Sequence, residues 1–255
     1  MTPPLLPYCG APPAPADWLA AWNLDPVLIA VWSGVGLACA ASPALRARDA
    51  AGRRTRAAFA AGWSIALVAW ISPLCALGVA LFGVRVAQHM LLALVAAPLL
   101  AVGLPARAPG ARHALAAGLA FAVATWLWHV PGPYEATFRS SALYWCMHAT
   151  LLASAVATWR VLLARDAGVA APSLLALASC FQMSLLGALL TFAPAPLFAP
   201  HLATTAAWGL SPLEDQQLGG LALWVPGCAV FLLAGVAPVA RWIATRERIA
   251  ASTAL

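Results

Sequence analysis

Three histidines lie within or at the end of apolar segments, where a polar ring is costly. They stand in the stretches VAQHMLL, WLWHVPG and YWCMHAT as His89, His129 and His148. Ionisable groups in apolar membrane segments usually face the interior of a helix bundle or a water-filled cavity. Imidazole nitrogens from neighbouring helices can converge on one ion, and imidazole suits copper, zinc and iron. We therefore treat these three residues as candidate metal ligands.

A second polar group stands before the last apolar segment, in SPLEDQQLGGLALWVPG. An acidic residue at a helix start is explained by the helix dipole or by capping, which contributes about 0.3–1 kcal/mol. Two further glutamines are not explained this way, so we hypothesise a polar pocket shared with the histidines, in which Asp215 orients a His ring or attracts a cation. The residues assigned to this pocket are Gln88, Trp128, Tyr134, Glu135, Asp215, Gln216 and Gln217. Gly219 and Gly220 would let a neighbouring helix approach closely.

Each candidate also has a purely structural explanation. Histidine, tryptophan and glutamine are common where a helix end meets the membrane surface, because an apolar body and a polar tip suit that position. His129, next to Trp128 and Pro131, can simply end a helix. Met90 and Met147 neighbour histidines in sequence, so on a helix they point about 100° away and fit packing better than metal binding. The metal hypothesis therefore depends on the three histidines gathering in one place.

The elements that must bring them together are membrane helices. Hydrophobic residues make up 63% of the chain, charged residues only 9%, and the mean hydropathy is +0.86, whereas soluble domains have about 25% charged residues. Seven segments are candidates for crossing a bilayer, which takes about 20 residues. They are residues 25–44, 57–82, 87–104, 113–130, 142–163, 172–193 and 217–240. We predict an all-α, polytopic bundle of seven transmembrane helices over residues 25–242, with a Pro-rich outer N-terminal segment (1–24) and a cytoplasmic tail (243–255).

The basic residues predict the orientation of this bundle. All of them are arginines, and twelve of the fourteen fall in segments that seven spans place on one side. They are Arg46, Arg48, Arg53, Arg54, Arg56, Arg107, Arg112, Arg160, Arg165, Arg241, Arg246 and Arg248. Arg85 and Arg139 fall on the other side. Because cytoplasmic loops are enriched in Arg and Lys, the N-terminus is predicted outside and the C-terminus in the cytoplasm. His89, His129, His148 and His201 then share the outer face, and His113 lies on the inner side.

Several other classes of protein are disfavoured. The six cysteines are scattered without a C-x-x-C pair, so we predict no disulfide framework and expect the cysteines within apolar runs to act as small hydrophobes. The N-terminus lacks a basic stretch followed by an apolar core, so no cleavable signal peptide is expected. There is no phosphate-binding loop, dinucleotide fingerprint or nucleophile elbow, and no nucleophile–base pair can be named, so a non-enzymatic role is favoured. The basic charge reports membrane orientation and not nucleic-acid binding.

Six stretches in this order resemble a known family. They are WNLDPVLIA, SPL at residues 72–74, VAQHMLLALVAAPLLAVGLP, WLWHVPGPYEAT, MHATLL and WGLSPLEDQQLGGLALWVP, and they extend from about Trp22 to Trp242. Together they are similar to the polytopic cytochrome c oxidase assembly factors associated with caa3-type oxidases. The resemblance implies a multi-pass protein of the bacterial plasma (inner) membrane that helps a haem-copper oxidase to mature by assisting copper binding, delivery or insertion. It implies a copper ion as cofactor, and oxidase subunits, periplasmic copper chaperones and the lipid bilayer as partners. His201 stands where the family favours an aromatic residue, so no role is carried onto it.

Two other functions remain open at this point. A copper transporter would need polar residues along a path to the cytoplasm, and few occur in the inner halves of the spans. A haem-binding membrane redox protein would use two of His89, His129 and His148 as axial ligands. The C-x-x-C and M-x-x-M signatures of metallochaperones are absent, which favours a role in assembly over direct delivery of copper.

Overall fold

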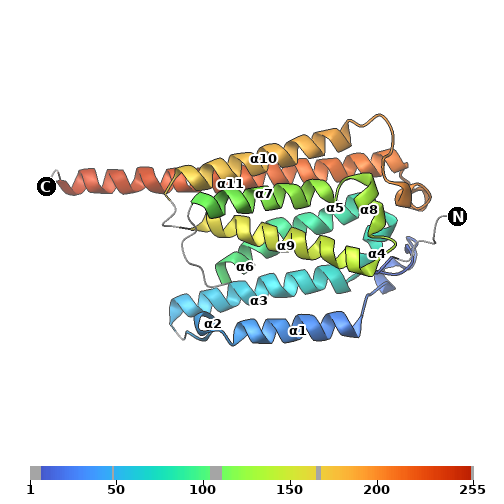
Figure 1. Ribbon diagram of the computed structural model, residues 1–255, viewed down its shortest axis with the longest axis horizontal. Helices are drawn as coiled ribbons and strands as arrows, with labels where there is room; N and C mark the ends of the chain where they lie inside the picture. Colours follow the sequence, from blue (N-terminus) through green and yellow to red (C-terminus); the bar gives the residue numbers. More distant parts are fainter. Residues whose placement is uncertain (1–6, 48, 104–110, 165–167, 254–255) are drawn as a thin grey trace.

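Long helices lie side by side along the long dimension of the computed structural model, which describes residues 7–47, 49–103, 111–164 and 168–253 (Figure 1). No strand occurs within these ranges. The long helices are α1 (Pro26–Ala40), α3 (Ala50–Ile71), α7 (Ala111–Leu127), α9 (Ser141–Leu163), α10 (Ala170–Thr191) and α11 (Pro212–Thr253). The shorter ones are α2 (Pro43–Arg46), α4 (Pro73–Ala80), α5 (Phe82–Leu91), α6 (Ala97–Gly103) and α8 (Pro131–Ala136). 3-10 turns occupy Trp18–Ala20, Ala199–His201 and Thr205–Trp208.

Helices long and apolar enough to cross a membrane are present, as the composition predicts. Four meet this description: Phe82–Gly103, Ser141–Leu163, Ala170–Thr191 and Pro212–Ile249. A fifth is obtained if α3 and α4, bent by 51° against each other, count as one broken span. Pro26–Ala40 and Arg112–Leu127 are apolar but shorter. The all-helical membrane fold is therefore confirmed, while the number of seven spans and the direction of insertion stay predictions.

The second and third predicted segments differ from the observed helices. Residues 57–82 do not form one helix, because Ser72 is extended (φ −75°, ψ 169°) and Pro73 starts a new helix. The third helix begins at Phe82 and not at residue 87, so His89 lies inside a helix and not at its start. A π-helical stretch, Leu92–Ala96, joins α5 to α6 and begins three residues after this histidine. Such insertions are frequent at functional sites.

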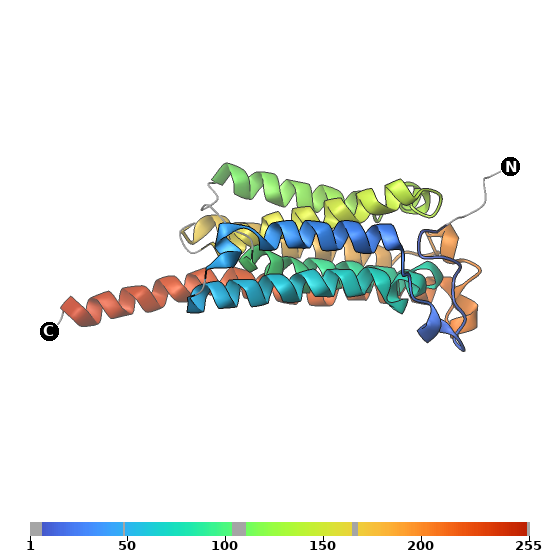
Figure 2. The same cartoon turned by 90° about the horizontal axis from the view of Figure 1, so that it is seen from below.

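The last helix is longer than predicted at both ends. It begins at Pro212, so Glu214 and Asp215 occupy its first turn, and it continues past residue 240 to Thr253. In Figures 1 and 2 its C-terminal part projects beyond the other helices, and the two chain termini lie at opposite ends of the bundle. The end at which the chain starts is formed by α4, the start of α5, α8 and the turns at 199–208 (Figure 1). We call it the N-terminal end. Arg48, Arg107 and Arg165, which the orientation argument used, lie outside the described residues.

Four of the six cysteines are paired, so the prediction of no disulfides is wrong. Cys9 is bonded to Cys75, and Cys180 to Cys228, with Cα–Cα distances of 5.4 and 4.2 Å. Cys39 and Cys146 are free. Sequence separations of 66 and 48 residues hide both pairs from any local motif.

Two glycines allow α11 to pack closely against α5 and α10, as predicted. A Cβ atom on Gly219 would meet the ring of Phe82 at 2.5 Å. A Cβ atom on Gly220 would overlap the Thr191 hydroxyl and approach the Gly187 carbonyl oxygen to 2.7 Å. These are contacts at which a side chain forces the helices apart, as expected for small residues at a membrane helix interface.

Gly220→Ala is therefore expected to destabilise the protein by about 1–3 kcal/mol, because its methyl group meets helix backbone that cannot move aside cheaply. The measurement is the midpoint of thermal unfolding of the purified protein. Gly34→Ala is the matched control, since a Cβ atom on Gly34 would meet nothing within 4 Å. Equal midpoints for the two variants would contradict the close approach of α10 and α11.

Candidate metal-binding site at the N-terminal end

The three predicted histidines come together from three separate elements. His89 belongs to α5, His129 to the turn after α7, and His148 to α9. All three are buried, with exposed fractions of 3%, 3% and 0%. The ring centre of His89 lies 5.5 Å from that of His129 and 5.3 Å from that of His148. His89 is thus the common neighbour of the other two, and we call these residues the histidine cluster.

Backbone carbonyls set the tautomers of two of these rings. Nδ1 of His129 is 2.7 Å from the Thr125 carbonyl oxygen, and Nδ1 of His148 is 3.1 Å from that of Tyr144. A carbonyl oxygen only accepts hydrogen bonds, so each Nδ1 donates and each neutral ring keeps its lone pair on Nε2. Both Nε2 atoms are buried without a partner, as are both ring nitrogens of His89. In metal-binding histidines, the ring nitrogen that does not bind the metal usually donates to a carbonyl or carboxylate in this way.

The spacing of the rings suits a shared ion. Two imidazoles held by metal–nitrogen bonds of about 2 Å at tetrahedral or trigonal angles have ring centres about 5 Å apart, close to the two observed distances. Within the described ranges, however, no three side chains of the His, Cys, Asp and Glu types are already gathered closely enough to hold an ion. The cluster therefore has the right donors in the right neighbourhood, and the rings must turn their free nitrogens toward one point before they bind.

Asp215 has a different partner from the ones hypothesised. Its carboxylate accepts hydrogen bonds from the backbone amides of Phe82 (2.6 Å) and Gly83 (3.0 Å), at the start of α5. These amides have no acceptor within their own helix, so Asp215 caps α5 from α11. The hydrogen bonds of the histidine cluster go to backbone carbonyls instead. Asp215 thus positions the helix that carries His89.

Other members of the predicted pocket are also engaged with the protein. Gln88 donates from Nε2 to the Ala69 carbonyl oxygen (2.6 Å), and the Trp128 indole donates to the Thr150 hydroxyl (2.9 Å). Gln216 donates to the carbonyl oxygen of Leu190 and accepts from the amide of Leu197, so it fastens the segment after α10 to α11. These side chains hold the helix ends around the cluster.

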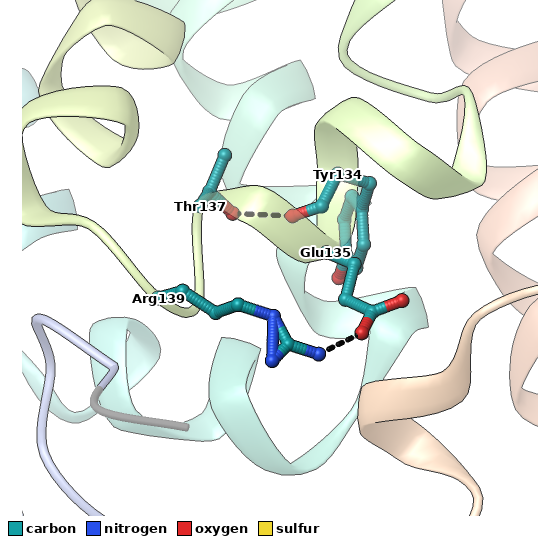
Figure 3. Close-up of polar contacts among 4 residues, drawn as sticks. All are labelled: Tyr134, Glu135, Thr137 and Arg139. Atoms are coloured by element: carbon teal, nitrogen blue, oxygen red, sulfur yellow. Dashed lines mark hydrogen bonds and ion pairs between the residues drawn. The ribbon is translucent and has the colours of Figure 1, made fainter. Parts of the chain in front are cut away.

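Glu135 and Gln217 are partly exposed, unlike the rest of the predicted pocket. Glu135 forms an ion pair with Arg139 one helical turn further on, and the Thr137 hydroxyl donates to the Tyr134 carbonyl oxygen at 2.7 Å (Figure 3). This places Glu135 in a local contact at the end of α8 and not among the buried histidines. Tyr134 itself is fully buried.

A buried arginine beside the cluster was not among the predicted site residues. Arg85 is 2% exposed, donates from Nε to the Gly78 carbonyl oxygen (3.0 Å), and its Nη1 is buried without a partner. Its guanidinium carbon lies 4.7 Å from the ring centre of Phe138, 5.5 Å from that of Tyr144 and 5.8 Å from that of Tyr134. Cation–π contacts of this kind offset part of the cost of burial. A lone Arg four residues before His89 in an apolar run was the available signal.

His201, to which the sequence assigned no role, also belongs to this end. It is 2% exposed, and its Nε2 lies 2.7 Å from the Tyr134 hydroxyl. Burial, and next the charge of Arg85, lower the pKa of His201 to about 3. The ring is therefore neutral at physiological pH, and its Nδ1 has no partner. Its position in a loop hid this contact from sequence reasoning.

Comparison with known proteins decides the family. The family model for the cytochrome c oxidase caa3 assembly factor (Caa3_CtaG) matches residues 38–245. The chain belongs to this family. The resemblance inferred from the sequence motifs is thus confirmed. No curated protein and no solved structure matches the chain. The range matched by the oxidase assembly factor family contains the whole histidine cluster, Arg85, His201 and Asp215, whereas Cys9 precedes it.

Removing the Asp215 carboxylate is expected to destabilise this assembly factor. Asp215→Ala leaves two amides at the buried start of α5 without their acceptor, which costs about 1–3 kcal/mol. Asp215→Asn retains one acceptor oxygen and should lose less. Gln217→Ala, at a half-buried neighbour, is the control and should change stability least. Thermal unfolding followed by circular dichroism measures the order, and an Asp215→Ala midpoint equal to that of Gln217→Ala would refute the cap.

Acid is expected to destabilise the protein partly through His201. An unfolded histidine has a pKa of about 6.5, so below that pH the unfolded chain binds a proton that the folded chain excludes. Stability therefore falls as pH drops from 6.5 toward the folded pKa of about 3, and His201 accounts for about 2 kcal/mol of this loss at pH 5.

His201→Gln, which can still bond the Tyr134 hydroxyl, should lose less stability between pH 7 and pH 5 than the wild type. Thermal unfolding at the two pH values gives the comparison. His113→Gln, at an exposed position on α7, is the control. The same pH dependence in wild type and His201→Gln would argue against a buried neutral ring.

Proposed function

We propose that this caa3-type oxidase assembly factor holds a copper ion between His89, His129 and His148 while the oxidase matures. One observation carries the proposal: the buried imidazole of His89 adjoins those of His129 and His148, with Nε2 free on the latter two and both nitrogens free on His89. A buried polar group without a partner costs free energy, and a bound ion is one arrangement that offsets this cost for several imidazole nitrogens at once. The protein would then supply this bound copper ion to the oxidase, which incorporates it.

Copper is favoured over zinc and iron by the donors and the family together. Neutral imidazole accepts all three metals, so the ligand set alone does not choose. The oxidase served by this family is a haem-copper enzyme. Its assembly therefore requires a supply of copper, which favours copper as the bound metal. A non-enzymatic role fits the cluster, in which no nucleophile and base are paired.

The alternatives are less well supported. Transport of copper would need polar side chains along the whole bundle. In the part of the chain that the structure describes, the buried arginine, histidine and aspartate side chains all lie in or near the N-terminal end: on α5, after α7, in the first half of α9, in the turn at 199–201 and in the first turn of α11. They are Arg85, His89, His129, His148, His201 and Asp215. This arrangement suits a site at one membrane face better than a path across the membrane.

We further propose that the N-terminal end faces the outside of the bacterial plasma membrane. The described arginines support this orientation, because most of them lie toward the opposite end and such residues favour the cytoplasm. Copper would then be exchanged at the outer surface with oxidase subunits and periplasmic copper chaperones. The bilayer surrounds the remaining length of the bundle.

His129→Ala with His148→Ala is expected to remove both bound copper and oxidase maturation. The two substitutions delete two of the three donors, and a lone imidazole holds the ion poorly. Metal analysis of the purified protein and oxidase activity of membranes from cells expressing it are the measurements. His113→Ala, at the opposite end of α7, is the matched control. If the double variant binds no copper but still supports full oxidase activity, the proposed metal role is refuted. A haem Soret band in the purified protein would favour haem binding instead.

A further inference from the structure

We infer that Cys9 and Cys75, when reduced, form a second Cu(I) site beside the histidine cluster. The inference rests on the proposed function only in its choice of copper as the metal. Cys9 lies in the segment before α1 and precedes the residues matched by the family, while Cys75 lies in α4. Thiolate sulfur prefers Cu(I), and two such donors suffice for this ion.

The two sulfur atoms share one aromatic neighbour. Each Sγ atom is 3.4 Å from the Tyr144 hydroxyl oxygen. Cys75 is buried, with 1% exposed, whereas Cys9 is partly exposed. A reductant or an ion therefore reaches the pair from the Cys9 side. The Cα atoms lie 5.4 Å apart on separate segments, which lets the sulfurs separate around an ion once the bond between them is opened.

Opening the bond requires a dithiol reductant from outside the chain. One thiolate of the reductant attacks a sulfur of the pair, and its second thiol then releases the mixed disulfide. The Cys9–Cys75 bond takes up two electrons and two protons, and the reductant becomes a disulfide. When Cu(I) binds, both thiols lose their protons, so the bis-thiolate complex carries one negative charge.

A counter-charge for this complex is already present. Arg85 is 2% exposed. Within the described residues, no carboxylate oxygen lies within 4.0 Å of its guanidinium nitrogens, the distance that defines an ion pair. An unpaired buried cation is costly. The guanidinium carbon lies 5.5 Å from the centre of the Tyr144 ring, whose hydroxyl touches both sulfurs. An anionic Cu(I) complex at Cys9 and Cys75 would offset that charge.

The sulfur pair also lies next to the histidine cluster. The Tyr144 ring lies at an angle to His148, with ring centres 4.3 Å apart, and Tyr8 also stacks on Tyr144, at 4.9 Å. One side chain thus separates the sulfurs from the nearest imidazole. In this arrangement the sulfur pair accepts Cu(I) first, and the oxidised pair ties the segment before α1 to α4.

The second disulfide provides a matched control. Cys180 and Cys228 join α10 and α11 within two membrane-spanning helices, away from Arg85 and Tyr144. The test uses the full chain in lipid nanodiscs under anaerobic conditions. One sample is reduced with a phosphine, which is then removed, and the other sample keeps its disulfides intact. Cu(I) is titrated against a chromophoric chelator, and the bound equivalents are counted for the wild type and three variants. The variants are Cys9→Ser/Cys75→Ser, Cys180→Ser/Cys228→Ser and His89→Ala/His129→Ala/His148→Ala.

In the Cys180→Ser/Cys228→Ser protein, reduction opens only the Cys9–Cys75 pair and is expected to add about one Cu(I) equivalent, since two thiolates bind one ion. The wild type should gain at least this equivalent, and the Cys9→Ser/Cys75→Ser protein should gain about one equivalent less than the wild type. Cys39 and Cys146 are present in every form, so their contribution cancels. No gain in the Cys180→Ser/Cys228→Ser protein, or equal gains in the wild type and the Cys9→Ser/Cys75→Ser protein, would overturn the inference.

The histidine variant separates this inference from the proposed function. If the cluster binds no copper, the triple variant has the same count as the wild type, and the gain on reduction still decides the sulfur site. If the Cys9→Ser/Cys75→Ser protein fails to fold, the reduced and oxidised forms of the Cys180→Ser/Cys228→Ser protein can be compared instead, because they leave Cys9 and Cys75 unchanged. A gain there supports the site, and equal counts refute it.

Discussion

The carboxylate of Asp215 joins the first turn of α11 to the first two amides of α5, and much of the N-terminal end depends on this contact. In the interior of a membrane protein these amides have no water to bond, so an acceptor from another helix is needed. Asp215 supplies it at 2.6 and 3.0 Å. The contact sets the depth of α5, and with it the positions of Arg85, Gln88 and His89. Gly219, one turn further along α11, leaves room for the Phe82 ring beside the same joint.

Around this joint the protein gathers polar rings and keeps them neutral. Aromatic side chains pack against the imidazoles: Phe82 contacts His129 and His201, and Trp70 contacts His148. The one buried positive charge among the described residues belongs to Arg85. Neutral imidazole is the form that binds metal, so burial prepares the cluster for a cation while the guanidinium opposes one. At the proposed copper site, an added anionic ligand would reconcile these two opposing effects.

The helix carrying His89 is irregular just beyond it. The π-helical stretch from Leu92 to Ala96 shifts the helix face, and the Trp159 indole donates to the Ala93 carbonyl oxygen at 2.7 Å within this stretch. A side chain of α9 thereby stabilises the irregular backbone, and α9 is also the helix that carries His148. Two histidines of the cluster are thus held in mutual register by a contact deeper in the bundle, which connects the packing of the core to the geometry of the site.

Composition and motif order determined the helical membrane class and the family, because hydropathy and motifs are properties of neighbouring residues in the chain. The sequence proposed His89, His129 and His148 as a group, and only the tertiary structure brought their rings together. The partners of individual side chains were decided only by the tertiary structure. Asp215 caps a different helix, Cys9 and Cys75 pair across 66 residues, and Arg85 lies beside the cluster. Each of these depends on how helices rotate and slide against one another, and the packed side chains set that rotation. The break between α3 and α4 is different, since Pro73 is visible in the sequence and interrupts a span that hydropathy alone made continuous.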